Sequence, residues 1–418
     1  MKASFRLLAL ATDWLHSGHM RRLQAGRAST IANLILIFSY HIVVTFDLIV
    51  GDVLLLAVIF ERFRSKCLET YKLDPAFYLS AAQLSFDAAL KKTDAHLDLI
   101  SDPAMFTMID SGIRGGISMI SNRYAKANNP LVAGYDPSKP KSWIKGLDAN
   151  NLYGWAMSQA LPISDFEWVP QDELNKINWL SLKEDDSKGY IVTVDLEYPS
   201  EIHDAHNDYP LAPERMRVKD EWLSDKLINI RSQYNMPRGD GTSKLIPNLM
   251  DKKGYVIHYQ NLRFYLEHGM KLTKVYNAIR FTQKAWLQSY IEMNQKLRAE
   301  ATTTFDTDFY KLMNNAVFGK TCENQKKRTN IAIIQDKQKL LDYAAKPTFM
   351  NFRIFGDDLM AIETQKTQNL INRPFYAGFA ILELAKLHMY RYVFLISCYF
   401  IVGRTSILRH INLLTSYQ

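Results

Sequence analysis

The stretch 147–154 reads Leu-Asp-Ala-Asn-Asn-Leu-Tyr-Gly and begins at the last residue of the run Trp143–Leu147, which reads Trp-Ile-Lys-Gly-Leu. The run predicts a short strand that ends at Asp148, and a two-residue turn then leads into a predicted helix over 151–159. A carboxylate at the end of a strand is fixed by the backbone, which suits a metal ligand. The alternative is a structural turn, in which Asp148 caps the helix and Tyr153 enters the core.

A second pattern lies in the segment 283–320, which contains no Gly or Pro before Gly319. Three threonines at 302–304 interrupt it, so the sequence predicts two helices, the second running over 305–318 with Thr304 as its N-cap. At about 100° per residue, the fourth, seventh and eighth positions after Lys311 return to one face of that helix. These positions are Asn315, Phe318 and Gly319. The alternative is an ordinary amphipathic helix with Leu312, Val317 and Phe318 in the core.

Both stretches resemble motifs of family B DNA polymerases. The first resembles Asp-x-x-Ser-Leu-Tyr-Pro, with Asn151 for serine and Gly154 for proline. The string LDANNLYGWAMSQALP (147–162) closely resembles the protein-primed polymerases of Polinton (Maverick) transposons. The second resembles Lys-x-x-x-Asn-Ser-x-Tyr-Gly, with Ala316 for serine and Phe318 for tyrosine.

The resemblance implies a role for each matched residue. Asp148 is the expected catalytic metal ligand, in a site that needs two Mg²⁺ ions about 3.5–4 Å apart. Tyr153 is the expected steric gate, whose ring lies where a ribose 2′-hydroxyl would go. The expected contacts of the incoming nucleotide come from four residues of the second motif, which are Lys311, Asn315, Phe318 and Gly319.

Weaker likenesses lie upstream. The tetrapeptide 113–116, Ile-Arg-Gly-Gly, resembles the family's Tyr-x-Gly-Gly motif, so Arg114, Gly115 and Gly116 are expected to contact DNA, as is Lys320. Asp52 resembles the metal-binding aspartate of the third exonuclease motif, but Leu48 stands where that motif has tyrosine. The first two exonuclease motifs have no counterpart, so we expect proofreading to be absent.

The second catalytic carboxylate motif, Asp-Thr-Asp, is not found after the predicted nucleotide helix. The triplet at 306–308 has that sequence but precedes Lys311 on the same helix. The run Gly356-Asp357-Asp358 resembles the Gly-Asp-Asp of RNA-templated polymerases. We reject it because the likeness to Polinton polymerases continues beyond it to Tyr390. Asp195, within a predicted strand over 190–198, is not assigned to the site. The sequence therefore predicts impaired or absent synthesis.

The predicted fold class is α+β: a right-hand palm and fingers with a partial exonuclease domain, truncated before the third catalytic motif and the thumb. The expected segments begin with an unrelated start (1–47) and an exonuclease remnant (48–110), which includes a helix over 48–68. The palm part with the metal motif follows (111–162), and then a palm strand with an insertion that resembles the terminal-protein region (163–275) and is loop-rich to about 255. The last three are the fingers (276–330), a second insertion with a palm segment (331–392), and an unrelated tail (393–418). The histidines of 201–213 show no ligand spacing and are interpreted as structural.

Composition agrees with this assignment. The net charge of +8 and the pI near 9.1 suit a polyanionic partner. Three widely spaced cysteines argue against a disulfide scaffold or a zinc module. The apolar runs 31–46 and 392–402 are interrupted or too short to span a bilayer, so we expect an intracellular protein of the nucleus or cytoplasm, neither secreted nor in a membrane.

The expected partners are primer-template DNA, dNTP and a terminal protein. A rival hypothesis is a non-catalytic module that binds DNA or a terminal protein, using backbone charges that include Lys320, Lys326, Lys327 and Arg328.

Overall fold

A computed structural model describes residues 53–119, 124–144, 148–236, 243–356, 358–368 and 370–402. Asp52, the start of the chain and the tail from 403 lie outside these ranges, as does Asp357. The chain divides into two compact units, Met1–Phe77 and Tyr78–Gln418. This division falls inside the segment 48–110 that the sequence assigned to a single exonuclease remnant.

The described part of the first unit is a helix over 53–71 followed by the 3-10 turn η2 (Pro75–Phe77). The expected helix over 48–68 is confirmed where it is described. Arg64 binds Asp74 with two parallel contacts, from Nε at 2.9 Å and from Nη2 at 2.7 Å. The side-chain hydrogen bond from Arg64 lowers the pKa of Asp74. This bidentate pair fixes the chain where it leaves the helix.

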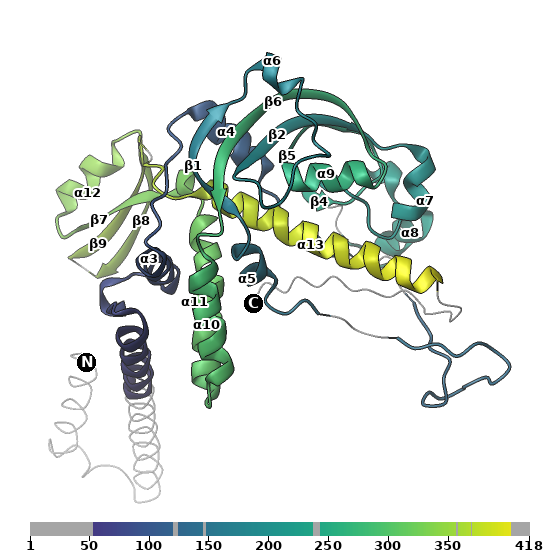
Figure 1. Ribbon diagram of the computed structural model, residues 1–418. Coiled ribbons are helices and arrows are strands. Elements are labelled where there is room, and N and C mark those ends of the chain that lie inside the picture. The colour runs from purple at the N-terminus through teal and green to yellow at the C-terminus, as the bar shows by residue number, and fades with distance from the viewer. Residues whose placement is uncertain are drawn as a thin grey trace, which may run out of the picture. The chain divides into compact units, whose positions relative to one another are not determined.

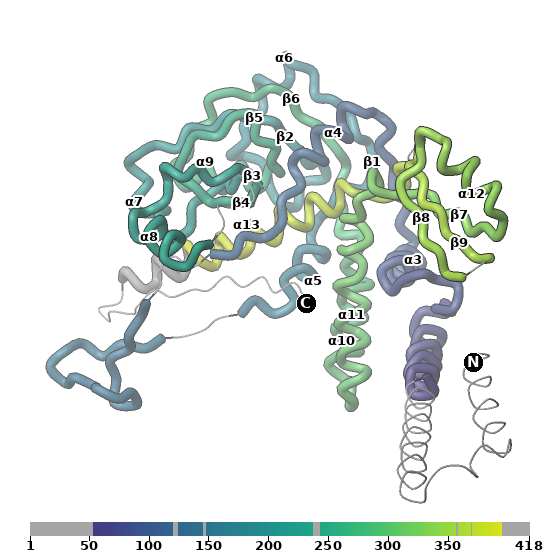
Figure 2. The backbone as a smooth tube through the Cα atoms, turned by 180° about the vertical axis from the view of Figure 1, so that it is seen from behind, coloured from purple at the N-terminus to yellow at the C-terminus, as the bar shows by residue number. Residues whose placement is uncertain are grey.

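The second unit is built on a four-stranded antiparallel sheet (Figures 1 and 2). Its order is β1-β6-β2-β5, with bounds Leu161–Trp168, Lys271–Lys284, Lys188–Glu197 and Lys252–His258. β2 confirms the strand predicted over 190–198. Its residue Ile191 pairs with Ile279 on one side and with His258 on the other. The long strands β1 and β6 were not predicted, and β1 corrects the expectation of a loop-rich segment from 163.

Helices α4 (Pro103–Gly112), α9 (Tyr259–Glu267) and α13 (Phe375–Val402) pack on this sheet (Figure 1). The start of α13 approaches the end of α11 very closely. A Cβ at Gly378 would lie 2.6 Å from Cys322 Sγ and 3.0 Å from Thr321 Oγ1. Only glycine allows this approach without displacing a neighbour.

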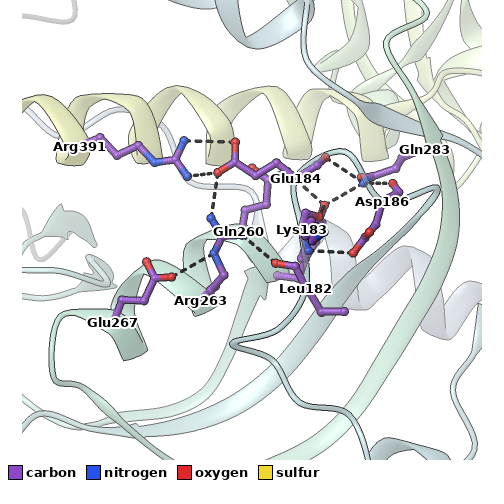
Figure 3. A network of polar contacts seen from close by, with 10 residues as sticks. Leu182, Lys183, Glu184, Asp186, Gln260, Arg263, Glu267, Gln283 and Arg391 are labelled. Atoms are coloured by element: carbon purple, nitrogen blue, oxygen red, sulfur yellow. Dashed lines mark hydrogen bonds and ion pairs between the residues drawn. The ribbon is translucent and has the colours of Figure 1, made fainter.

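Figure 3 shows a polar network that holds α13 to α9 and to the loop before β2. Glu184 accepts hydrogen bonds from Arg263 Nη2 at 3.0 Å and from both terminal nitrogens of Arg391. Arg263 Nη1 also donates to Leu182 O at 2.7 Å. Partial burial alone would raise the pKa of Glu184, but the two guanidinium groups lower it below its ordinary value. One carboxylate therefore joins three segments that are far apart in sequence.

Helices α10 (Gln288–Glu300) and α11 (Thr304–Thr321) form an antiparallel pair beside α3 (Ala81–Thr93). The predicted break at 302–304 is confirmed, but the N-cap of α11 is Thr303 rather than Thr304. The side chain of Thr303 accepts the Asp306 N–H at 3.1 Å. Tyr290 of α10 donates to the Met313 carbonyl at 3.2 Å, which joins the two helices in the core.

Smaller elements fill the expected insertion 163–275. The strands β3 (Glu214–Met216) and β4 (Lys244–Ile246) form a two-stranded sheet. The helices and 3-10 turns are α6 (Gln171–Leu174), η3 (Ser200–Ile202), α7 (His203–His206), η4 (Asp220–Trp222) and α8 (Asp225–Gln233).

After η5 (Gln325–Lys327), the chain forms a separate three-stranded antiparallel sheet of order β7-β9-β8 (Figures 1 and 2). Its bounds are Thr329–Ile334, Leu359–Gln365 and Phe349–Gly356. Helix α12 (Lys337–Ala344) packs on one face, over a small core of Ile334, Met360 and Ile362.

Helices and antiparallel sheets thus coexist in the second unit, which confirms the α+β class. Within the described ranges, no helix has the length and apolar character needed to cross a membrane.

Candidate functional site

Two motifs separated by more than 160 residues meet in the structure. Helix α5 (Leu152–Met157) carries Tyr153 and α11 carries Phe318. The two rings stack with centroids 4.5 Å apart and an interplanar angle of 13°. Such offset stacking contributes about 0.5–1.5 kcal/mol beyond the area buried. The residues expected to touch the sugar and the base of a nucleotide are therefore in direct contact.

The turn before α5 places Asp148 at the surface. Asp148 is exposed and does not cap the helix, because the N-cap residue is Asn151. Asn151 adopts the left-handed conformation (φ 54°, ψ 46°), which asparagine tolerates better than most residues. The predicted strand before Asp148 is corrected. Trp143 and Ile144 belong to no strand, and 145–147 lie outside the described residues. The aspartate is thus held by an irregular turn.

The predicted face of α11 is partly open. Lys311 and Gly319 are exposed and Asn315 is half-buried, while Phe318 is buried under Tyr153. A Cβ at Gly319 would meet no atom within 4 Å, so no described neighbour requires glycine there. The alternative, an ordinary amphipathic helix with its apolar residues in the core, agrees with the burial of Val317 and Phe318. Leu312, however, is 46% exposed and does not enter the core.

Arg114, expected to contact DNA, lies in the protein interior. Its guanidinium sits 3.8 Å from the centroid of the Tyr255 ring, and Nη1 donates to Val256 O at 2.8 Å. Only 8% of the residue is exposed. The guanidinium is thus held by partners inside the protein, Gly112 O at 3.3 Å among them, and its expected contact with DNA stays a prediction. The glycines beside it, Gly115 and Gly116, are half-buried.

An apolar cavity adjoins Tyr153. It is enclosed by the glycine segment, α5, the loop before β3 and one side of α13, with lining residues Gly116, Ile117, Met119, Leu152, Tyr153, Tyr209, Pro210, Leu382, Ala385, Lys386, Met389 and Tyr390. The α13 residues were not among the predicted site residues. The signal that could have found them is the family likeness, which extends through Lys386 to Tyr390.

A buried charge cluster supports the wall of this cavity. Glu383 and Lys386, one turn apart on α13, form an ion pair, and both are almost completely buried. Glu383 Oε2 also accepts the Asn261 amide at 3.0 Å. Burial alone would raise the pKa of Glu383, but the positive charges of Lys386 and Arg114 lower it. The carboxylate therefore stays ionised between two cations.

Most of the basic residues expected at a DNA surface have acidic partners within the protein. Lys320 contacts Glu323 at 2.7 Å, and Lys326 contacts Asp110 at 2.7 Å. Arg328 donates to Glu323 at 2.8 Å, and this bond is the main reason that the pKa of Glu323 is lowered to about 2. Lys327 is exposed. These pairs reduce the positive charge that this end of α11 presents.

The acidic side chains near the predicted motifs have different environments in the described part of the chain. No group of three or more His, Cys, Asp or Glu side chains that could hold a metal ion occurs among the described residues. Asp195 is buried, accepting the Gly254 N–H at 2.7 Å and the Tyr276 hydroxyl at 3.0 Å. Asp306 and Asp308 lie on the first turns of α11. Asp148, the one metal ligand predicted from the sequence, is exposed, and its role stays a prediction.

The histidines of 201–213 have structural environments. His206 is buried with Nδ1 2.9 Å from the Tyr198 hydroxyl, and burial lowers the pKa of His206 to about 4. His203 Nε2 lies 3.1 Å from the Tyr198 carbonyl oxygen. Both contacts hold the short helix α7 against Tyr198, the residue that follows β2.

His258 gives the fold a pH dependence. It is fully buried, neither ring nitrogen has a hydrogen-bond partner in the described structure, and burial lowers its pKa to about 4. An unfolded histidine takes up its proton near pH 6.5. The unfolded state therefore binds more protons between pH 6.5 and 4, and stability falls as the pH drops through that window.

We expect His258→Leu to weaken this loss. The leucine has a similar volume and cannot be protonated, so stability at pH 7 should be equal or higher and the decline toward pH 4.5 shallower. Urea unfolding at pH 7, 6, 5 and 4.5 measures both. His206→Gln serves as the comparison, since it removes the other histidine with a pKa near 4. A decline identical to that of the unmodified chain would exclude His258 as a source.

No protein-family profile matches the chain, and no curated protein matches it. Among solved structures, the chain is similar to phi29 DNA polymerase in an orthorhombic crystal form, with 14% identity and a TM-score of 0.43 over 77% of this chain. It is similar to the post-translocation binary complex of phi29 DNA polymerase with primer-template DNA, with the same values. The ternary complex with primer-template DNA and incoming nucleotides gives 14% identity and a TM-score of 0.42 over 76% of this chain. The chain spans 46% of each of these structures, about half of their length.

Proposed function

We propose that the chain derives from a protein-primed family B DNA polymerase of the Polinton type, and that it binds primer-template DNA and dNTP. The reaction of that class is deoxynucleotidyl transfer to a primer 3′ end or to a terminal-protein hydroxyl. The observation that carries the proposal is the Tyr153–Phe318 stack. Two motifs found independently in the sequence, in the family's order, contact each other as parts of one nucleotide site would.

Each residue then has a chemical task. The exposed ammonium of Lys311 would pair with triphosphate oxygens, a charge-assisted contact that is stronger than a neutral hydrogen bond. The Tyr153 ring would block a ribose 2′-hydroxyl, and the Phe318 ring, buried under Tyr153 here, would have to shift to pack on the new base pair. Gly319 leaves open space beside the helix for the ligand. These tasks are binding and selection, and none of them requires a second carboxylate.

The transfer step is where we expect the chain to fail. Two Mg²⁺ ions need carboxylate ligands, and Asp148 would supply one of them. No Asp-Thr-Asp follows α11 in this sequence to supply the other, because the triplet at 306–308 lies at the start of that helix. We therefore propose binding without efficient synthesis.

The second candidate is a purely non-catalytic module that holds DNA or a terminal protein. The observation that favours it is that no group of three or more potential metal ligands occurs among the described residues. The two candidates differ in dNTP binding, because a module that only holds DNA has no use for Lys311.

We expect Lys311→Gln to weaken dNTP binding roughly tenfold or more, since a hydrogen bond to a charged group is worth about 1.5–3 kcal/mol. The measurement is the dNTP concentration that stabilises a complex with dideoxy-terminated primer-template in Mg²⁺. Lys339→Gln is the matched control, because Lys339 is also an exposed helical lysine but lies on α12. Equal effects of the two changes would mean that Lys311 acts only as a general surface charge, which would favour the non-catalytic candidate.

A further inference from the structure

Strand β8 is an open edge of the small sheet. In the order β7-β9-β8, β8 pairs only with β9 among the described strands. Seven of its eight residues are exposed, all except Phe349. Half of the backbone N–H and C=O groups of an edge strand point away from its neighbour, and they are available to pair with another strand.

This edge lacks the usual protection. Natural edge strands carry lysines, prolines or inward-pointing charges that discourage pairing with other chains. The β8 sequence, Phe-Met-Asn-Phe-Arg-Ile-Phe-Gly, contains one charged residue and no proline. Its register irregularities fall near the ends, between 349 and 351 and between 354 and 356, so the centre 351–354 pairs regularly with β9.

The core of the small sheet stops short of this edge. Phe352 and Ile354 pair with Ile362 and Met360, two buried residues on the face that α12 covers. Yet Phe352 is 47% exposed and Ile354 is 59% exposed. Directly opposed residues of an antiparallel pair project on the same face, so both side chains lie at the margin of the core. One more strand beside β8 would continue that core.

We propose that the occupant of this edge is β8 of a second copy of the chain, paired antiparallel across a two-fold axis at Phe352. The two sheets would then form one six-stranded sheet. A two-fold interface closes on itself at β8, and β7 stays as the outer edge at each end of the joined sheet. The inference concerns self-association and does not depend on the proposed nucleotide site.

The register follows from side-chain direction and charge. Residues that oppose each other across the two β8 strands must project on the same face of the joined sheet. The two-fold axis must therefore pass through a residue position rather than between two residues. An axis at Phe352 places Phe352 against its own copy, and it places the Arg353 charge opposite the neutral Asn351. An axis at Arg353 would oppose two guanidinium groups, which is unfavourable. The Phe352 axis also sets Met350 against Ile354, so apolar groups meet on both sides.

Sedimentation equilibrium of the full chain tests the association. We expect a concentration-dependent dimer, and a roughly 30-fold or greater rise in its Kd for Phe352→Lys, which puts two ammonium groups at the centre. Ile331→Lys is the control: Ile331 is 68% exposed on β7, the opposite edge, and its change should leave the dimer intact. A monomeric unmodified chain at about 100 μM, or equal weakening by both changes, would overturn the proposal.

Disulfide trapping tests the register and keeps the proposal testable if a lysine variant folds poorly. Opposed Cα atoms in an antiparallel pair lie about 4.5–5.5 Å apart, within disulfide reach. Phe352→Cys should therefore form a covalent dimer on mild oxidation. Ile354→Cys should not, because the two copies of residue 354 would be about 14 Å apart along the strands. The unmodified chain gives the background. Equal trapping of both variants, or trapping of neither, would exclude this register.

Discussion

Glu383→Ala is expected to lower the free energy of unfolding by about 3–5 kcal/mol, because it leaves a buried ammonium without its carboxylate. Glu383 is the common partner of the Lys386 charge and the Asn261 amide, and it lies near the Arg114 charge as well. All three groups are largely buried, with Asn261 at 0%, Lys386 at 7% and Arg114 at 8% exposure. Denaturant unfolding monitored by circular dichroism measures the loss.

Two variants control this prediction. Glu267→Ala removes a partly exposed carboxylate that contacts Arg263 at 3.3 Å within one helix, and it should cost less than about 1 kcal/mol. The double variant Glu383→Leu with Lys386→Met removes both charges, so it should be less destabilised than Glu383→Ala alone. A loss below about 1 kcal/mol for Glu383→Ala would contradict the buried pair.

Phe318→Ala should lower stability by about 3–5 kcal/mol, the usual cost of deleting a buried phenylalanine ring. Phe318 is 9% exposed and loses both its core contacts and its stack on Tyr153. Phe318→Tyr keeps the ring and restores the tyrosine of the family motif, so it should cost less than about 1.5 kcal/mol. Thermal and urea unfolding of both variants make the comparison.

A double-mutant cycle between Tyr153→Ala and Phe318→Ala isolates the stack from the remaining packing. We expect a coupling energy of about 0.5–1.5 kcal/mol. Additive effects would mean that the two rings do not touch in solution, and the structural support for a joint nucleotide site would be lost.

The sequence predicted the elements whose patterns are local. The two helices α10 and α11 are separated by threonines, and a threonine caps the second, although one position earlier than expected. The alternating pattern of β2 was visible in the sequence because the strand is rich in apolar and β-branched residues. In β1 the alternation is disturbed by Asp165, which adopts φ 57° where the pairing with β6 shifts register. A strand with such a bulge loses the period of two that identifies it.

Tertiary packing buries three charged residues whose burial nothing in the local sequence indicates. Arg114 reads as a surface cation beside two glycines, yet its partners Tyr255 and Val256 come from a strand about 140 residues later. Glu383 and Lys386 are spaced like an ordinary surface pair on a helix, and nothing local indicates their burial. The contact between Tyr153 and Phe318 was not predicted, although the family likeness gave both residues a common ligand.

The decisive measurement is primer extension by the purified chain with Mg²⁺ and all four dNTPs, beside Asp148→Ala, with primer-template binding followed in the same samples. We expect DNA binding that weakens with salt in both proteins and no extension by either. Extension by the unmodified chain that Asp148→Ala abolishes would contradict the account, because a second carboxylate would then have to complete the metal site. Failure of both proteins to bind primer-template DNA would contradict the proposed binding function itself.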